Sequence, residues 1–225
     1  MPDKETKNNL YEGLSKLMKA LSNPLRLEII EMLSQGEKSV EGLVNAMDIT
    51  FANASQHLQV LKNNNIVKSR KQGRYVYYSI AGNEFLSCYQ HLLQYGIREI
   101  AELDRILNKQ REEHKSSEAV SLEELEEKLQ SDDVQLIDVR PHIEYEFGHI
   151  PQARSVPVNE LLKYLEHLPG NTEIIAYCRG PFCTLSDKAV KALWEKGFKA
   201  RRLHEGYPEW KLRQRKSARS IKQNK

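Results

Sequence analysis

Two cysteines in one short loop, Cys178 and Cys183, are the residues of this sequence best suited to covalent chemistry. An apolar run, 173–177, precedes the first cysteine, and a helical pattern, 185–196, follows the second. A thiol between a buried strand and a helix N-terminus lies in the positive field of the helix and of converging backbone N–H groups. With Arg179 beside it, Cys178 is therefore predicted to be a reactive thiolate rather than a packed strand-end cysteine.

The spacing of this loop argues against one class of cysteine enzyme, the tyrosine phosphatases. Tyrosine phosphatases place an arginine six positions after their cysteine to clamp phosphate, and here that position is Thr184. Phosphate-ester hydrolysis is therefore disfavoured. The candidate active-site loop beside the catalytic Cys178 comprises Arg179, Gly180, Pro181, Phe182, Cys183 and Thr184.

The second half of the chain alternates helical and strand patterns. Ser121 begins a capping box for a helix that reaches about residue 130. Further helical segments are expected near 159–167 and 185–196. Such an order is typical of an α/β fold with a mostly parallel sheet. The expected strands are 134–139, 173–177 and 199–203. Asp138, Arg140 and His149 are interpreted as structural hydrogen-bonding anchors rather than catalytic groups.

The first half of the chain is mostly helical, with one predicted hairpin. Its helical segments are expected at 10–21, 24–35, 39–47 and 53–63, followed by one long helix over 83–111. Strands are expected at 66–71 and 74–80, joined by a turn at Gln72 and Gly73. The segments 39–47 and 53–63 form a helix-turn-helix pattern, with Thr50 as the expected N-cap of the second helix.

Polar side chains on the second helix and a basic hairpin tip indicate a double-stranded DNA partner. Amide and cationic side chains on a helix can contact base edges and phosphates in the major groove. A basic hairpin tip suits phosphate or minor-groove contact. The alternative for the helix alone is an ordinary solvated face. The candidate DNA-binding residues are Asn53, Ser55, Gln56, His57, Gln59 and Lys62 of the helix and Lys71, Arg74 and Tyr75 of the hairpin.

Charge and composition divide the 225 residues into parts with different partners. Residues 1–115 have a net charge of +2, residues 116–210 of −6 and residues 211–225 of +7. We expect a DNA-binding and dimerisation domain over 1–111, a linker at 112–119, an α/β domain over 120–212 and a disordered basic tail at 213–225. No apolar run approaches the roughly 20 residues of a membrane span, and no secretory leader is visible. With three cysteines, an odd number, a cytoplasmic location is predicted.

Residues of the first half resemble the ArsR/SmtB family of winged-helix repressors. The resemblance lies in 21–29, 53–61, 66–67 and the hairpin segment 73–78, and it covers about residues 10–110. It implies an α+β winged helix-turn-helix fold and a homodimer paired through the first and last helices. It also implies an operator with two-fold symmetry.

The metal sites of many members of that family have no counterpart in this sequence. The stretch 43–46 lacks the cysteines of their sensing helix, and His91, Glu102, Asp104 and His114 show no convincing ligand spacing. We therefore predict neither a metal site nor a cofactor. Cys88 is expected to be a packed residue.

The second half resembles rhodanese, the sulfurtransferase family. The resemblance lies in 138–141, 144–153, the loop 178–183 and the segment 205–210, and it covers about residues 119–212. Glu205 departs from the pattern, because many members have glycine there. The resemblance implies that the Cys178 thiolate takes the outer sulfur of a small anionic donor as a persulfide and passes it to a thiol acceptor or to cyanide. Cys183 then either attacks this persulfide and closes a disulfide or simply fills the sixth position of the loop.

Together the two halves suggest a transcriptional regulator linked to sulfur or thiol chemistry. One alternative is a sulfurtransferase whose helical half is a dimerisation scaffold. The other is a repressor whose rhodanese-like domain senses an anion or an oxidant without catalysis.

Overall fold

The computed structural model describes residues 3–113, 118–130, 134–165 and 172–223. The chain forms two compact units, Met1–Cys88 and Tyr89–Lys225. This division falls within a helix and not at the predicted linker 112–119. Of that linker, residues 114–117, including His114, lie outside the described residues. The predicted domain boundaries stay a prediction.

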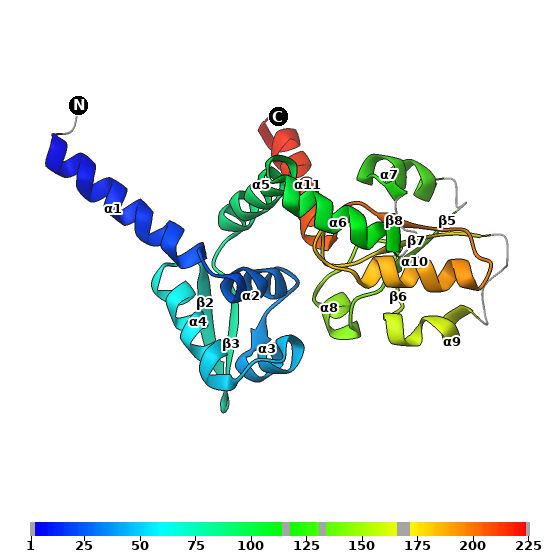
Figure 1. The fold of residues 1–225 in the computed structure, drawn as a ribbon, viewed down its shortest axis with the longest axis horizontal. Coiled ribbons are helices and arrows are strands. Elements are labelled where there is room, and N and C mark those ends of the chain that lie inside the picture. The colour runs from blue at the N-terminus through cyan, green and yellow to red at the C-terminus, as the bar shows by residue number, and fades with distance from the viewer. Residues whose placement is uncertain (1–2, 114–117, 131–133, 166–171, 224–225) are drawn as a thin grey trace. The chain divides into compact units, whose positions relative to one another are not determined.

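The first unit combines helices with a small three-stranded antiparallel sheet (Figure 1). The sheet has the order β1-β3-β2. Its helices bury an apolar core that includes Ile29, Ile30, Leu43, Leu58 and Leu61. The elements are α1 (Lys4–Leu21), α2 (Pro24–Ser34), β1 (Lys38–Ser39), α3 (Val40–Met47), α4 (Phe51–Asn63), β2 (Val67–Gln72) and β3 (Tyr75–Ile80), and α5 (Asn83–Glu99) begins in this unit.

Local capping explains where these helices begin. The Thr50 hydroxyl accepts a hydrogen bond from the Asn53 amide at 3.2 Å, which confirms the predicted N-cap of α4. The hairpin turn is one residue later than predicted, because Gln72 pairs with Tyr75 within the ladder. The turn is therefore Gly73 and Arg74. Gly73 has φ of +59°, which suits the first central position of a type II′ turn.

The second unit is an α/β fold built on a five-stranded sheet of order β4-β8-β7-β5-β6. All of its strand pairs are parallel. The elements are α6 (Ala101–Glu113), β4 (Ala119–Val120), α7 (Leu122–Gln130), β5 (Val134–Asp138), α8 (His142–Phe147), β6 (Arg154–Ser155), the 3-10 helix η1 (Val158–Glu160), α9 (Leu161–Leu165), β7 (Glu173–Tyr177), α10 (Leu185–Glu195), β8 (Ala200–Leu203) and α11 (Tyr207–Gln223).

Helices cover both faces of this sheet. One apolar cluster joins the sheet to α9 and α10 through residues such as Leu161 and Val190. Another joins it to α7 and the start of α11 through Leu125 and Tyr207. Figure 1 shows α7 on one side of the strands and α9 and α10 on the other. The predicted winged helix-turn-helix fold and the predicted α/β fold with a mostly parallel sheet are both confirmed.

Three predictions about local structure were wrong. The single helix over 83–111 is two helices, α5 and α6, separated at Ile100, a few residues after Gly96, whose helix propensity is low. The basic tail continues α11 to Gln223, because residues 209–223 contain good helix formers and neither glycine nor proline. Cys88 is exposed, since Leu86, Tyr89 and Gln90 occupy the buried face of α5.

A buried charge network ties β5 and β7 to the segment that follows α8. The Arg140 guanidinium binds Asp138 through Nε at 2.9 Å and donates from Nη2 to the Gly148 carbonyl at 2.8 Å. The Tyr177 hydroxyl donates to Asp138 Oδ2 at 2.7 Å and accepts from the Ile150 amide at 3.0 Å. Asp138 and Arg140 are 0% exposed. Because these buried groups are paired, the prediction that they are structural anchors agrees with the geometry.

Replacing Tyr177 with phenylalanine should lower the free energy of unfolding of the second unit by about 1–3 kcal/mol, because a buried carboxylate and a buried amide lose a partner. Tyr145→Phe is the matched control. It loses only the bond from Tyr145 to the Ala153 carbonyl at 2.8 Å and should cost less. Urea denaturation measures both, and an equal or smaller loss for Tyr177→Phe would contradict a stabilising role for the network.

Candidate functional site

Cys178 lies directly after β7, at the carboxyl edge of the parallel sheet. Ligand and catalytic sites of open α/β sheets are found at this edge. The loop from Cys178 to Thr184 leads into α10 and turns on a hydrogen bond from the Cys183 amide to the Gly180 carbonyl at 3.1 Å. The Cys178 side chain is only 3% exposed, so the loop wraps the sulfur.

The Cys178 sulfur is stabilised as an anion by neutral hydrogen-bond donors. Its pKa is lowered to about 6, and the largest cause is a hydrogen bond from the Cys183 thiol. The Ser186 hydroxyl, 3.2 Å away, and the amides of Ser186 and Gly180 also lower the pKa, while burial opposes them. As a neutral thiol, Cys178 instead donates to the Cys183 carbonyl at 3.3 Å. At neutral pH most of this thiol is therefore ionised.

The pKa of Cys183 shifts in the opposite direction to that of Cys178. The ionised Cys178 beside it and burial raise the pKa of the Cys183 thiol well above its ordinary value. The two sulfurs therefore share one proton, which stays on Cys183. Cys183 is therefore a hydrogen-bond donor to Cys178 in the resting loop.

Arg179 is paired with a carboxylate from a distant segment of the chain. Its guanidinium forms two hydrogen bonds with the Glu144 carboxylate, from Nε and Nη2, both of 2.9 Å. Glu144 is 1% exposed, so the pair neutralises a buried carboxylate and anchors the loop to α8. The predicted role of Arg179 as a fixed positive charge beside the thiolate stays a prediction.

The start of α11 supports the loop from the other side. A Cβ at Gly206 would lie 2.4 Å from the Gly180 nitrogen and 2.5 Å from the Arg179 carbonyl carbon, so only glycine fits this close approach. The Tyr207 amide also donates to the Cys178 carbonyl at 3.3 Å. Segment 205–210 therefore shapes the loop although it carries no nucleophile.

Other predicted residues of the loop lie nearer its surface, and two functional residues were missed. Phe182 is 36% exposed, and Thr184 occupies the N-cap position of α10 without a side-chain capping bond. Ser186 was missed, although a hydroxyl in the first turn of the helix after the loop was a usable signal. Glu144 was missed because nothing in its local sequence pairs it with Arg179.

On α4, the predicted DNA-binding residues separate by exposure. Gln56, Gln59 and Lys62 are exposed, whereas Asn53 and Ser55 are partly buried. His57 is partly buried: its Nδ1 is buried, and burial together with nearby Arg26 lowers its pKa. The exposed amides and Lys62 form the face available to a groove, and the predicted part of His57 in DNA binding stays a prediction.

The predicted hairpin residues lie at the tip of β2 and β3. Lys71, Gln72, Gly73 and Arg74 are exposed. The Arg74 guanidinium lies 5.0 Å from the Tyr75 ring centroid and donates to the Tyr75 hydroxyl at 2.8 Å. The pairing holds the cation at the tip without neutralising it.

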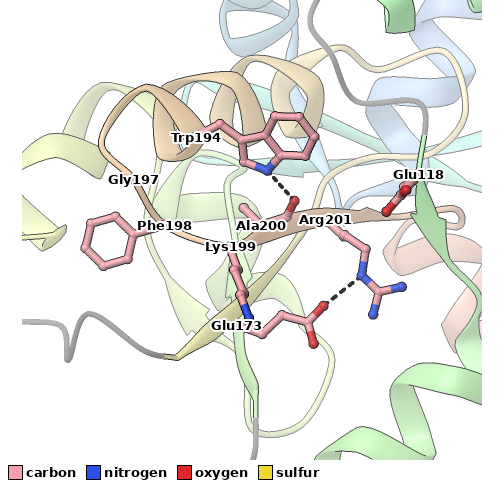
Figure 2. Close-up of a pocket in the computed structure, with 8 residues that line it drawn as sticks. All are labelled: Glu118, Glu173, Trp194, Gly197, Phe198, Lys199, Ala200 and Arg201. Atoms are coloured by element: carbon pink, nitrogen blue, oxygen red, sulfur yellow. Dashed lines mark hydrogen bonds and ion pairs between the residues drawn. The ribbon is translucent and has the colours of Figure 1, made fainter.

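A hollow of about 430 Å³ lies at the edge of the sheet opposite the one that carries Cys178 (Figure 2). It lies where β7 and β8 begin, because Glu173 and Ala200 line it. Trp194 donates to the Ala200 carbonyl at 2.7 Å, and Arg201 pairs with Glu173 at 2.7 Å. These polar groups are satisfied by one another, and Cys178 lies at the other end of β7, so this hollow is separate from the thiol site.

Within the described ranges, no three His, Cys, Asp or Glu side chains are grouped as a metal site. Among the same residues, no helix has the length and apolar character to cross a bilayer.

Comparisons with known proteins match both halves of the chain. The family model of the bacterial regulatory protein arsR family matches residues 23–69, and that of the rhodanese-like domain matches residues 121–213. HTH-type transcriptional regulator Rv0324 of Mycobacterium tuberculosis is 34% identical over 216 residues, which cover 92% of this chain and 91% of that protein.

Other relatives match only the first half. The cadmium resistance transcriptional regulatory protein CadC homolog of Staphylococcus aureus is 44% identical over 68 residues, 30% of this chain and 56% of that protein. A homodimeric winged helix-turn-helix DNA-binding domain of Mycobacterium bovis has 30% identity and a TM-score of 0.42, covering 44% of this chain and 92% of that one.

The full-length match to a transcriptional regulator, the arsR-family match over α2–α4 and the rhodanese-like match around Cys178 agree with the two folds described above. This chain belongs to the ArsR family of winged helix-turn-helix transcriptional regulators, in a form that carries a rhodanese-like domain.

Proposed function

We propose that this regulator binds an operator in double-stranded DNA and that sulfur carried on Cys178 alters that binding. The observation that carries the proposal is the buried Cys178 sulfur, whose pKa is lowered to about 6 by thiol, hydroxyl and amide donors. A structural cysteine has no need of this arrangement, which costs desolvation of an anion. A nucleophile at neutral pH does need it.

The proposed chemistry has two steps. The Cys178 thiolate attacks the outer sulfur of a small anionic donor such as thiosulfate. A sulfur–sulfur bond forms at Cys178, the donor's sulfur–sulfur bond breaks, and sulfite leaves with the electron pair. A thiol acceptor then removes the outer sulfur and restores the thiolate. The donors from Gly180 and Ser186 are placed to stabilise the persulfide anion as they stabilise the thiolate.

A persulfide on Cys178 also gives Cys183 a defined alternative role. If the Cys183 thiol attacks the inner sulfur, a disulfide forms and the outer sulfur leaves as hydrosulfide. The raised pKa of Cys183 disfavours its thiolate in the resting protein, so transfer to an external acceptor is the preferred path.

For the first unit we propose DNA binding through α4 and the hairpin tip. The exposed Gln56, Gln59 and Lys62 on α4 suit base-edge and phosphate contact, and Lys71 and Arg74 suit the phosphate backbone. The arsR-family match over 23–69 includes α4, which favours a DNA reader over a simple dimerisation scaffold.

We further propose a homodimer, paired through α1. Leu10, Leu14 and Met18 recur every four residues along this helix and are 64%, 49% and 53% exposed. An apolar stripe of this kind on a helix is typical of an interface. Sedimentation equilibrium of the full chain measures the mass directly, and a monomer at operator-binding concentrations would contradict this assembly.

The first test concerns Cys178 reactivity in a Cys88→Ser background, which removes the exposed thiol. The rate of alkylation at Cys178 should rise with pH through a midpoint near 6, because only the thiolate reacts. Ser186→Ala removes a donor to the anion and should move the midpoint upwards, towards the ordinary thiol value. Ser155→Ala on β6 is the matched control and should leave the midpoint unchanged. A wild-type midpoint near that of a free cysteine would sink the thiolate assignment.

The second test concerns the link between sulfur and DNA. Mass spectrometry after thiosulfate treatment should find one added sulfur atom on the Cys178 peptide of the wild type and none in Cys178→Ser. Affinity for an operator fragment, selected by the full chain from random DNA, should change about 5-fold or more on loading in the wild type alone.

The outcomes of this second test are distinguishable. Equal affinities for loaded and unloaded wild type would overturn the coupling and leave the persulfide intact. Absence of the added sulfur would overturn the persulfide and favour the alternative in which the rhodanese-like domain senses anions or oxidants without catalysis.

The third test concerns the hairpin tip. Lys71→Ala and Arg74→Ala should each weaken binding to all DNA sequences and reduce the salt dependence of affinity by about one released counterion. Lys191→Ala, an exposed cation on α10, is the control and should change neither quantity. Unchanged salt dependence in both tip variants would support the scaffold alternative.

A further inference from the structure

A cavity of about 590 Å³ lies beside the Cys178 loop, within the second unit. Pro181 of the loop, the segment 204–209 and the facing sides of α5 and α6 form its walls. This volume lies in the range of small-molecule sites. The lining residues are Gln94, Ile97, Arg98, Ala101, Asp104, Arg111, Pro181, His204, Glu205 and Glu209.

The cavity presents charges of both signs. Arg98 and Arg111 are its cations, and Asp104, Glu205 and Glu209 are its carboxylates. The Glu205 Oε2 atom is buried and has no hydrogen-bond partner among the described residues. The other oxygen of Glu205 is 3.8 Å from His204 Nδ1. A buried carboxylate oxygen without a donor is costly, and an ammonium group bound in the cavity beside Glu205 would compensate the charge of this carboxylate.

Glu209 connects the cavity to the reactive loop. Its Oε1 accepts a hydrogen bond from Gln90 Nε2 at 2.9 Å, and its Oε2 accepts from the Gly206 amide at 2.9 Å. A Cβ at Gly180 would lie 3.4 Å from either oxygen, so the carboxylate lies against the loop two residues after Cys178. A molecule in the cavity therefore borders the loop that carries the sulfur.

We propose that this cavity binds a small zwitterionic thiol, cysteine or a short cysteine-containing peptide, as the acceptor of sulfur from Cys178. Its ammonium group faces Glu205, and its carboxylate faces Arg98 or Arg111. The proposal rests on the proposed persulfide function and adds the acceptor class and its site. Glu205 is also the position where the sequence departs from the rhodanese pattern, so this feature belongs to the present chain.

The transfer step balances without any further reactant. The acceptor sulfur attacks the outer sulfur of the Cys178 persulfide, and a new sulfur–sulfur bond forms on the acceptor. The bond to Cys178 breaks, and its electron pair returns to Cys178 as thiolate. The proton of the acceptor thiol ends on the transferred sulfur. Burial raises the pKa of Glu209 to about 7, which suits a carboxylate that relays this proton.

Binding of unreactive analogues to the full chain tests the site without sulfur transfer. S-methylcysteine keeps the ammonium and carboxylate groups, whereas 3-(methylthio)propanoate lacks the ammonium. Calorimetry should show that S-methylcysteine binds at least about 10-fold more tightly, because a charged hydrogen bond is lost with the second probe. Glu205→Gln should remove this preference. Glu118→Gln, in the hollow of Figure 2, is the matched control and should keep it.

A second variant guards against a failure of Glu205→Gln to fold. Ala101→Trp, on the exposed wall from α6, fills the cavity and should abolish binding of S-methylcysteine. Absence of S-methylcysteine binding to the wild type, equal affinity for the two probes, or unchanged binding in both variants would overturn the site. Binding that follows the expected pattern in a protein that never gains sulfur at Cys178 would overturn the proposed function instead.

Discussion

The central constraint in the second unit is a buried sulfur, Cys178, whose pKa is lowered to about 6. Burial of Cys178 opposes its charge, and neutral donors from Cys183, Ser186 and Gly180 outweigh that penalty. Dipoles held in a fixed loop stabilise an anion without adding a second buried charge, which would need its own partner. A persulfide anion at the same place needs the same donors, so one set of groups serves both states of the proposed cycle.

Those donors stabilise the Cys178 anion only if the loop holds them in place. Ion pairs and close backbone contacts around the loop fix its position. Glu144 binds Arg179 on one side, and Gly206 contacts the loop backbone on the other. Beneath the loop, the Asp138–Arg140 pair is 0% exposed and is completed by Tyr177, the residue before Cys178. Paired buried charges cost little relative to unpaired ones and fix geometry. The polar residues near Cys178 thus fix the position of the strand end and the loop that carry it.

The sequence was informative wherever a local pattern determines structure. Apolar periodicity and capping chemistry predict the strand 173–177, the caps at Ser121 and Thr50 and the position of Cys178. The two-residue strands β1, β4 and β6 are too short to show alternation. Tertiary packing determines the partner of Arg179, which lies 35 residues away in the chain. It also determines the burial of His57 Nδ1. A short stretch of sequence contains no information on either contact. Residue type alone therefore does not determine exposure: on α4, Gln56 is exposed whereas Asn53 is partly buried.

A hydrogen bond joins the start of α11 to α5 within the second unit. The unit boundary at Cys88 and Tyr89 lies inside α5, which is one continuous helix from Asn83 to Glu99. Gln90 of that helix donates to Glu209, whose pKa is raised first by burial and also by the charges of Glu205 and Cys178. The charge of Cys178 thus acts in the same direction as burial on the carboxyl group that binds Gln90. Glu209 therefore connects the Cys178 loop to the part of α5 that lies in the second unit.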